Sequence, residues 1–356
     1  MTAGAAGDRA ALAALLRGES STYARFGSPL YAALTVRAAE DVEAGGPVWD
    51  VLGGLAQAKR THVPLHLFGA VHRLVLEGRA PDLAAHFPSS GGDGNADGAW
   101  DAIRKLLTEN GAEVRRLAQR PIQTNEPGRS AALLGGFLTI ARETGLPLAL
   151  LEIGTSAGLN LRWDRYRYES KAGSWGPEDS PVLITDVFVD AAPPLNVAPV
   201  VFERSGCDAQ PVDVSTDEGR LTLMSYVWPD QATRFEALKG AIAVAATVPA
   251  SIVHADAIDW LSGALAERRP GVATVVFHSA FIAYLDAGER ARLESVIAEA
   301  AGRANSDAPL SVLTLEPIDE GVVPPTFGVR LRMWPRGSDE LLAIASAHGP
   351  PVRWLA

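Results

Sequence analysis

The chain contains one cysteine, Cys207, among its 356 residues. No disulfide can form within it, and nothing in the sequence points to an oxidising compartment. Long apolar runs are also missing, because the longest, from Ala241 to Val253, is too short to span a bilayer and contains Pro249. The N-terminus lacks a basic segment followed by an apolar core. We therefore expect a cytoplasmic protein that does not enter a membrane.

Positive charge is scarce, since 32 Lys and Arg stand against 42 Asp and Glu and give a net charge of −10. This balance repels a phosphate backbone, so we predict no nucleic-acid partner. One group of basic residues on an expected helix is interpreted as a solvated face. Its members are Arg104, Lys105, Arg115, Arg116 and Arg120.

A recognisable set of metal ligands is missing as well. His62 and His66 are four residues apart, but Pro64 lies between them and no carboxylate or cysteine completes the set. We therefore predict that the protein has no metal site.

The sequence does contain enough apolar residues for a large core, because 47% are hydrophobic and only 21% are charged. Its length suggests two units. Apolar residues recur at helical spacing before Pro121, whereas short apolar runs alternate with amphipathic stretches after Pro147. We predict a helical N-terminal domain over residues 1–121 and an α/β domain over residues 122–356.

Five apolar runs in the second domain predict parallel strands, with helices between most of them. These runs are Leu148 to Ile153, Val200 to Cys207, Ser251 to Ala255, Thr274 to Phe277 and Leu310 to Leu315. The clearest helices are Asp230 to Ala246 and Gly288 to Ala301, and three short strands follow at Phe327 to Trp334, Leu341 to Ala347 and Val352 to Leu355. The predicted fold class is α/β, with a mostly parallel sheet and an antiparallel C-terminal edge.

The turn after the first of these strands is the main candidate for a ligand site, because ligands of such sheets bind beyond the carboxyl ends of the strands. Gly154 and Gly158 allow a sharp turn, and Glu152 places a carboxylate at the end of the strand. That charge would repel the pyrophosphate of a dinucleotide but suits the ammonium and sulfonium groups of S-adenosylmethionine. Ser156 also replaces the second glycine of the dinucleotide pattern.

The same turn matches the G-x-S-x-G pattern of a hydrolase nucleophile elbow, with Ser156 as the nucleophile. Against a hydrolase, helices rather than several strands precede the turn, and no oxyanion segment is evident. His348 and Asp319 could complete a triad, but no pattern fixes either of them. A serine hydrolase therefore stays open as the alternative.

Taken together, these features resemble the class I S-adenosylmethionine-dependent methyltransferase superfamily and, within it, the bacterial domain-of-unknown-function family 2332. The closer resemblance covers most of the chain. It rests on Ser28-Pro29-Leu30-Tyr31, Val71 to Leu76, Thr124 to Ser130, Glu152 to Tyr168, Arg204 to Asp208, Tyr226-Val227-Trp228-Pro229-Asp230 and His278-Ser279. It implies a Rossmann-like methyltransferase sheet of seven strands, mostly parallel with an antiparallel C-terminal edge. It also implies a methyltransferase acting on an unidentified acceptor, or a binding protein for S-adenosylmethionine without activity.

The resemblance also implies which residues bind the cofactor, S-adenosylmethionine. Asp208 would hold the ribose hydroxyls, because a carboxylate accepts two hydrogen bonds, and Asp256 would contact the adenine amino group. Asp208 could instead be a solvated loop acid, and Asp256 a helix N-cap. The full set is Glu152, Gly154, Thr155, Ser156, Gly158, Asn160, Asp208, Asp256, Ala257 and His278.

The methyl acceptor is expected near the fourth strand, where His278 could act as a general base and Tyr284 could line the pocket. A structural histidine and a core tyrosine are the simpler alternatives. Substrate contacts are predicted for Asn125, Glu126, Arg129 and Ser279. The first three could instead form a capping network for the helix that starts near Ser130.

The segment from Leu161 to Tyr168 interleaves arginines with aromatic residues. It could hold an anionic or aromatic substrate by stacking and bidentate pairing, or it could simply form surface ion pairs with Asp164.

Overall fold

Two structural units divide the chain in a computed structural model, which describes residues 3–57, 62–267, 269–319 and 325–356. The helical unit comprises Met1–Thr124 and Thr216–Phe235, and the sheet unit comprises Asn125–Ser215 and Glu236–Ala356. The predicted boundary between residues 121 and 122 lies close to the first division. The sequence analysis did not assign residues 216–235 to the helical unit.

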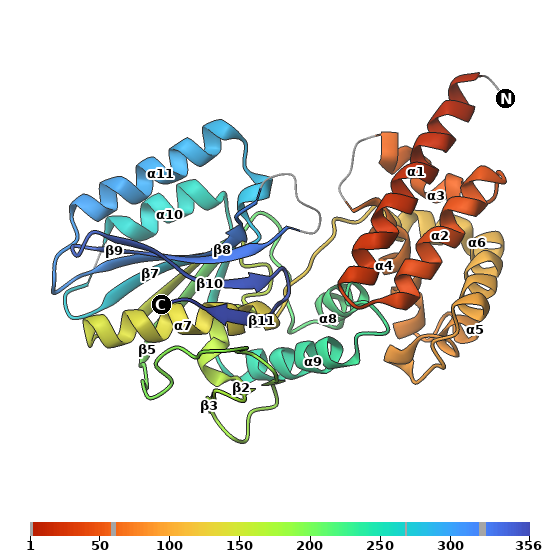
Figure 1. The fold of residues 1–356 in the computed structure, drawn as a ribbon. Helices are drawn as coiled ribbons and strands as arrows, with labels where there is room; N and C mark the ends of the chain where they lie inside the picture. Colours follow the sequence, from red (N-terminus) through yellow and green to blue (C-terminus); the bar gives the residue numbers. More distant parts are fainter. Residues whose placement is uncertain (1–2, 58–61, 268, 320–324) are drawn as a thin grey trace. The chain divides into compact units, whose positions relative to one another are not determined.

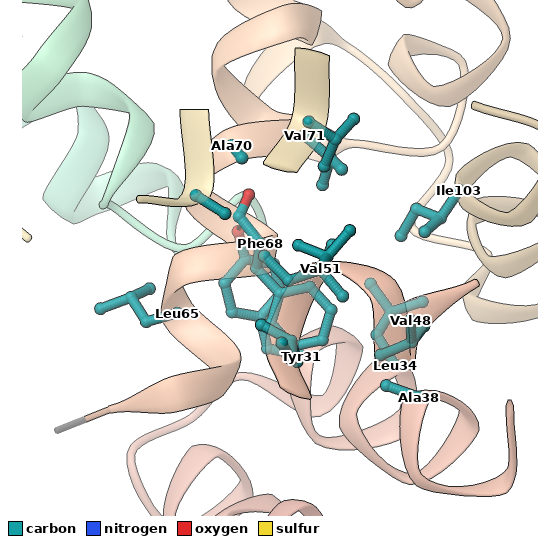
Figure 2. Packing of buried hydrophobic residues seen from close by; sticks show 14 of the residues in the cluster. Tyr31, Leu34, Ala38, Val48, Val51, Leu65, Phe68, Ala70, Val71 and Ile103 are labelled. Atoms are coloured by element: carbon teal, nitrogen blue, oxygen red, sulfur yellow. Dashed lines mark hydrogen bonds between the residues drawn. The ribbon is translucent and has the colours of Figure 1, made fainter. Parts of the chain in front are cut away.

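Amphipathic helices build the helical unit, and those that precede residue 124 are coloured red to yellow-orange in Figure 1. They are α1 (Ala3–Arg25), α2 (Pro29–Glu43), α3 (Val48–Gln57), α4 (Val63–Leu76), α5 (Pro81–Ala84), η1 (Pro88–Ser90), α6 (Ala96–Ala118) and α8 (Asp217–Ser225). Their apolar faces meet in one core, where the Tyr31 and Phe68 rings pack with centroids 4.7 Å apart (Figure 2). Removal of these side chains from water is the main driving force for assembling the helices.

Asp230 ties the later segment to the start of α2. Ser28 caps α2 by accepting a hydrogen bond from the Tyr31 amide, and its hydroxyl donates to the Asp230 carboxylate at 2.6 Å. The other Asp230 oxygen accepts from the Leu30 amide at 2.9 Å. Two sequence motifs about 200 residues apart therefore form one capping arrangement, in which the carboxylate satisfies an otherwise free amide of the first turn.

His72 is fully buried in the helical unit. Its Nδ1 lies 3.2 Å from the Ser225 carbonyl oxygen and its Nε2 lies 2.8 Å from the Ser89 hydroxyl. Burial lowers the pKa of His72 to about 4, since the charged imidazolium would lose its hydration. His72 is therefore neutral near pH 7.

The sheet unit is organised around one large sheet. Its strands are β1 (Leu148–Ile153), β5 (Val201–Asp208), β6 (Ser251–His254), β7 (Ala273–Ser279), β8 (Leu310–Pro317), β9 (Phe327–Trp334), β10 (Ser338–Ser346) and β11 (Gly349–Trp354). In the described residues the order is β11-β10-β9-β8-β7-β1-β5-β6. The pairs from β6 to β8 are parallel, and those from β8 to β11 are antiparallel.

Among the residues that the structure describes, the sheet has eight strands, so the predicted number of seven was wrong. The predicted antiparallel C-terminal edge is present, but each of its three strands pairs with its predecessor in the sequence and extends the five parallel strands. Short connections allow this order, because antiparallel neighbours need only a hairpin.

Helices cover both faces of the large sheet (Figure 1). On one face lie α10 (Ala257–Ala266) and α11 (Ala287–Gly302), which bury Leu261 and Ile297 against β1, β7 and β8. On the other lies α7 (Gly128–Thr144). A Cβ at Gly136 would lie 2.3 Å from the Leu313 side chain, so glycine is what lets α7 approach β8 so closely. The remaining helix, α9 (Ala232–Thr247), begins in the helical unit and continues in the sheet unit.

The connection from β1 to β5 contains η2 (Leu159–Arg165) and a small second sheet that was not predicted. Its strands are β2 (Arg167–Ser170), β3 (Gly173–Trp175) and β4 (Leu183–Ile184). Trp163 is fully buried and stacks on Phe137 of α7 with centroids 4.4 Å apart. Tyr166 and Tyr168 are buried too, so the hypothesis that these rings stack on a substrate was wrong. The alternative ion pair is found, since Arg165 Nε lies 3.2 Å from the Asp164 carboxylate, and Arg204 of β5 contacts the same carboxylate at 2.5 Å.

None of the described helices combines the length and the apolar character that crossing a membrane requires.

Candidate functional site

The carboxyl ends of the five parallel strands meet at one edge of the large sheet. From β1 the chain adds β5 and β6 on one side, and then β7 and β8 on the other. The order therefore reverses beside β1, and this is the position at which open α/β sheets bind their ligands. The turn at residues 154–158 follows β1 directly.

Three residues of this turn have a positive φ: Gly154 at 67°, Ser156 at 51° and Gly158 at 66°. At Gly154 and Gly158, glycine is required both by the positive φ and by the close packing around the backbone. A Cβ at Gly154 would lie 2.4 Å from the Phe281 ring, and one at Gly158 would lie 2.6 Å from Ile252. The turn is thus fitted closely to the loop after β7 and to β6.

Asp208, at the end of β5, holds the turn in place. One carboxylate oxygen accepts from the Ser156 amide at 2.9 Å, and the other accepts from the Gln210 amide at 2.7 Å. The Thr155 amide donates to the Cys207 carbonyl at 3.0 Å. Asp208 is therefore not merely a solvated loop acid. Each carboxylate oxygen can still accept another hydrogen bond.

Glu152 is buried, and its carboxyl group accepts a hydrogen bond from the Thr155 hydroxyl. Burial raises the pKa of Glu152 to about 8, despite the opposing hydrogen bond from Thr155. At pH 7 the Glu152 carboxyl group is therefore protonated in most molecules. The sequence argument that its negative charge repels a pyrophosphate assumed an ionised carboxylate, and that assumption was wrong near neutral pH.

Two asparagines flank the turn. The Asn125 side-chain oxygen accepts from the Leu159 amide at 2.8 Å, which connects the segment before α7 to the turn. Asn160 is 2% exposed, and its side-chain oxygen has no hydrogen-bond partner among the described residues. A buried acceptor without a donor is unfavourable unless a ligand or water supplies one.

The other residues predicted to contact substrate have structural partners. The Glu126 carboxylate accepts from the Gly128 amide at 3.1 Å, at the start of α7. Arg129 donates to the carbonyl oxygens of Ala347 at 2.9 Å and Ser279 at 3.3 Å. The capping alternative therefore accounts for Glu126, and Arg129 links α7 to β7 and to the β10–β11 turn.

Asp256 is the N-cap of α10, as the alternative proposed. Its carboxylate accepts from the Ile258 and Asp259 amides, both at 3.0 Å. Asp256 is exposed and Ala257 is the first residue of the helix, so both lie at the candidate edge beyond β6.

A histidine and a glutamate form a close pair beyond β7 and β8. His278 is 4% exposed, and its Nδ1 lies 2.6 Å from the Glu316 carboxylate. The same oxygen of Glu316 accepts from the Phe281 amide at 2.9 Å. Glu316 directly follows the predicted strand from Leu310 to Leu315, but the sequence pattern gave it no role. The missing signal was the register, which pairs His278 with Thr314 and places Glu316 two residues further on the same face.

Tyr284 is 74% exposed on the short helix η3 (Ile282–Tyr284). The alternative that it packs in the core was wrong, because the loop after β7 turns it outward. The predicted catalytic role of Tyr284 stays a prediction.

A cavity of about 420 Å³ lies elsewhere in the sheet unit, and no predicted site residue lines it. Its walls come from α7, β9, β10 and the end of β11, with Leu331 and Trp354 among the lining residues. Charged side chains line this cavity as well, among them Arg142, Glu143 and Arg336, but we assign the site from the strand ends, where the order of the sheet reverses. The described part of the chain also holds no cluster of three or more His, Cys, Asp or Glu that could bind a metal ion.

Comparison with known proteins identifies one family. Residues 13–354 match the model of a family described as "Uncharacterized protein conserved in bacteria (DUF2332)". No curated protein matches the chain, and no solved structure does. Because the match spans nearly the whole chain, the protein belongs to this family.

Proposed function

We propose that the sheet unit of this member of an uncharacterized bacterial family is an S-adenosylmethionine-dependent methyltransferase. The observation that carries the proposal is the turn at residues 154–158, which lies where the strand order reverses and is hydrogen-bonded to Asp208 of the neighbouring strand. A carboxylate next to such a turn suits a ligand with a ribose diol.

The residues present fit this cofactor in two respects. Asp208 keeps acceptor capacity on both carboxylate oxygens, as binding of two ribose hydroxyls requires. The unpartnered oxygen of Asn160 is an acceptor for an ammonium group. The raised pKa of Glu152 weakens its predicted attraction to the cofactor, but a nearby cation would favour the ionised carboxylate.

When bound, S-adenosylmethionine supplies an electrophilic methyl group on a positively charged sulfur. The contribution of this chain would be to position the ligands and to hold a proton, which requires no covalent step on the protein. Asp208, Asn160 and the amides of the turn would hold the cofactor. His278 lies on the neighbouring strand β7 and is the candidate proton acceptor.

Calorimetry with the purified full-length chain tests the proposal. We expect S-adenosylmethionine and S-adenosylhomocysteine to bind and NAD not to bind. Asp208→Asn should weaken binding at least tenfold, whereas Asp179→Asn, a matched change of an exposed acid between β3 and β4, should leave it unchanged. Circular dichroism would verify that both variants are folded. Absence of binding of both cofactor forms at millimolar concentration contradicts the proposal.

A serine hydrolase remains the second candidate, because one observation favours it. The His278–Glu316 pair has the hydrogen-bonding arrangement of the histidine and acid of a catalytic triad, and Ser156 has a positive φ in the turn after the adjacent strand. Against it, β1 is the first strand of the described chain, and η2 rather than an α-helix follows the turn.

A fluorophosphonate separates the two candidates, since it labels an activated serine. If the protein is a methyltransferase, the wild type and Ser156→Ala should both remain unlabelled. Labelling that is lost in Ser156→Ala but retained in Ser279→Ala would support the hydrolase instead.

A further inference from the structure

We propose that Glu316 holds His278 in the tautomer with its proton on Nδ1, so that Nε2 accepts the proton of an aromatic hydroxyl compound. The part concerning the substrate rests on the proposed methyltransferase function, in which that hydroxyl is the methyl acceptor. The part concerning the tautomer is independent of it.

The hydrogen bonds around the Glu316 carboxylate define the tautomer. One oxygen faces His278 Nδ1 at 2.6 Å and also accepts from the Phe281 amide. A carboxylate that already accepts from an amide requires a proton on the imidazole nitrogen that it contacts. The other oxygen is buried and has no partner in the described part of the chain, so the imidazole is the main group that compensates its charge.

The second ring nitrogen of His278 is available for a ligand. Among the described residues, Nε2 makes no hydrogen bond, in contrast to His72, where both ring nitrogens have partners. A neutral imidazole with Nδ1 protonated carries its lone pair on Nε2. Within the described residues His278 is thus left with a free acceptor, whereas both ring nitrogens of His72 have partners.

The class of ligand follows from the aromatic side chain beside the pair. Phe281 is half-buried, lies 5.6 Å from the His278 ring between centroids, and packs against Gly154 of the turn. It therefore contacts both the imidazole and the cofactor turn. An aromatic ligand can stack on this ring while its hydroxyl reaches Nε2.

The proton transfer is balanced within these groups. The O–H bond of the ligand breaks, its proton forms a bond to Nε2, and the oxygen keeps the electron pair as a phenolate. The resulting imidazolium is stabilised by the adjacent Glu316 carboxylate. An acceptor that is already ionised, such as a carboxylate, would not need this pair.

Nitrogen-15 NMR of the imidazole rings in the cofactor-free protein tests the first part. His278 is assigned by comparison with His278→Gln, and its tautomer is measured near neutral pH. We expect the Nδ1–H form in the wild type and in Glu316→Gln, whose carbonyl can still accept, but mainly the Nε2–H form in Glu316→Leu. Glu340→Leu, which removes an exposed glutamate of β10, is the control and should leave the signal unchanged.

A wild-type His278 with its proton on Nε2 overturns the assignment, and this measurement needs no variant to fold. An unchanged tautomer in a folded Glu316→Leu variant overturns it as well. Because no cofactor is present, failure here is distinct from failure of the methyltransferase proposal.

The ligand part is tested with p-nitrophenol, whose ionised form is yellow. At a mildly acidic pH, where the free phenol is mainly protonated, adding wild-type protein should increase the absorbance of the ionised form. Neither His278→Gln nor Phe281→Ala should give this increase. An absence of change in the wild type at millimolar p-nitrophenol overturns the assignment of an aromatic hydroxyl.

Discussion

Burial moves the pKa of a base in one of the two units, and that of an acid in the other, across or away from neutrality in favour of the uncharged form. The helical unit buries His72, a base whose pKa is lowered to about 4, and the sheet unit buries Glu152, an acid whose pKa is raised to about 8. Desolvation is the largest cause of both shifts, because it penalises whichever form carries the charge. The same physical effect therefore gives the two units opposite responses to pH.

The surroundings also differ in what they leave unsatisfied. His72 has a partner for each ring nitrogen, whereas buried oxygens of Asn160 and Glu316 at the candidate edge of the sheet unit have no partner among the described residues. Polar groups that serve only the fold are normally satisfied within it. This contrast is why we assign ligand chemistry to the sheet unit and a structural role to His72.

The largest expected effect comes from Glu152→Gln. The folded state keeps a proton that the unfolded chain loses above about pH 4.5, so wild-type stability falls as the pH rises toward 8. Gln cannot ionise, and it should gain stability relative to the wild type across this window, by roughly 3–5 kcal/mol at its upper end. Hydrogen exchange of the β1 and β7 amides at several pH values measures the difference. A difference independent of pH, like that expected for the exposed control Glu340→Gln, would contradict the neutral state of Glu152.

His72→Gln should show the opposite trend in the helical unit. The unfolded chain takes up a proton below about pH 6.5 while folded His72 does not until about pH 4, so wild-type stability is lost as the pH falls through this window. The variant should lack this loss, which amounts to roughly 2–4 kcal/mol. Exchange of the α4 amides provides the measurement, and His86→Gln, at a partly exposed histidine of the same unit, is the control. Parallel pH profiles for His72→Gln and the wild type would disprove the assignment.

Gly154→Ala tests the close fit of the turn within the sheet unit. Gly145→Ala is its matched control, because Gly145 has nearly the same φ, 66°, but no atom within 4 Å of an added Cβ. The shared backbone strain should cost each variant about 1–2 kcal/mol. Gly154→Ala should lose about 1 kcal/mol more, owing to overpacking against Phe281. Urea denaturation measures both variants, and equal losses would mean that the contact with Phe281 is not tight.

The smallest expected effect separates capping by Asp256 from binding. Asp256→Ala should destabilise the protein by about 1 kcal/mol, as should Asp286→Ala at the N-cap of α11. Asp256→Asn can still cap α10 and should change stability little. If Asp256 also contacts the cofactor, only the changes at Asp256, and not Asp286→Ala, should weaken binding of S-adenosylhomocysteine in calorimetry. Equal binding by all three variants would leave Asp256 with capping alone.

Periodicity and composition were sufficient to predict a strand wherever the apolar pattern within that segment marks it. The bounds predicted for β1 and β9 are confirmed residue for residue. The small sheet after η2 was missed, because its strands are only two to four residues long and its aromatic side chains had been interpreted as ligand contacts. Such short strands carry too few alternations to be recognised.

Contacts between distant residues could not be predicted from the sequence. The pairing of His278 with Glu316 depends on the register of β7 and β8, and the pKa of Glu152 depends on complete burial. Residue type indicated that both positions could carry chemistry. The charge state of Glu152 and the partner of His278 both depend on packing between segments that are distant in the sequence. A local sequence pattern does not reveal such packing.

The hydrogen bond between Ser28 and Asp230 also constrains the order of events during synthesis. It joins residues 202 positions apart, and the intervening chain includes β1 and β5 of the other unit. A ribosome that has released only residues 1–124 has therefore not yet delivered the segment that completes the helical core, including Trp228. Domains usually fold as units from the N-terminus onward during translation. Here the helical unit, whose synthesis begins first, cannot be completed until a large part of the sheet unit has emerged from the ribosome. Its unfinished core is accessible to chaperones during that time.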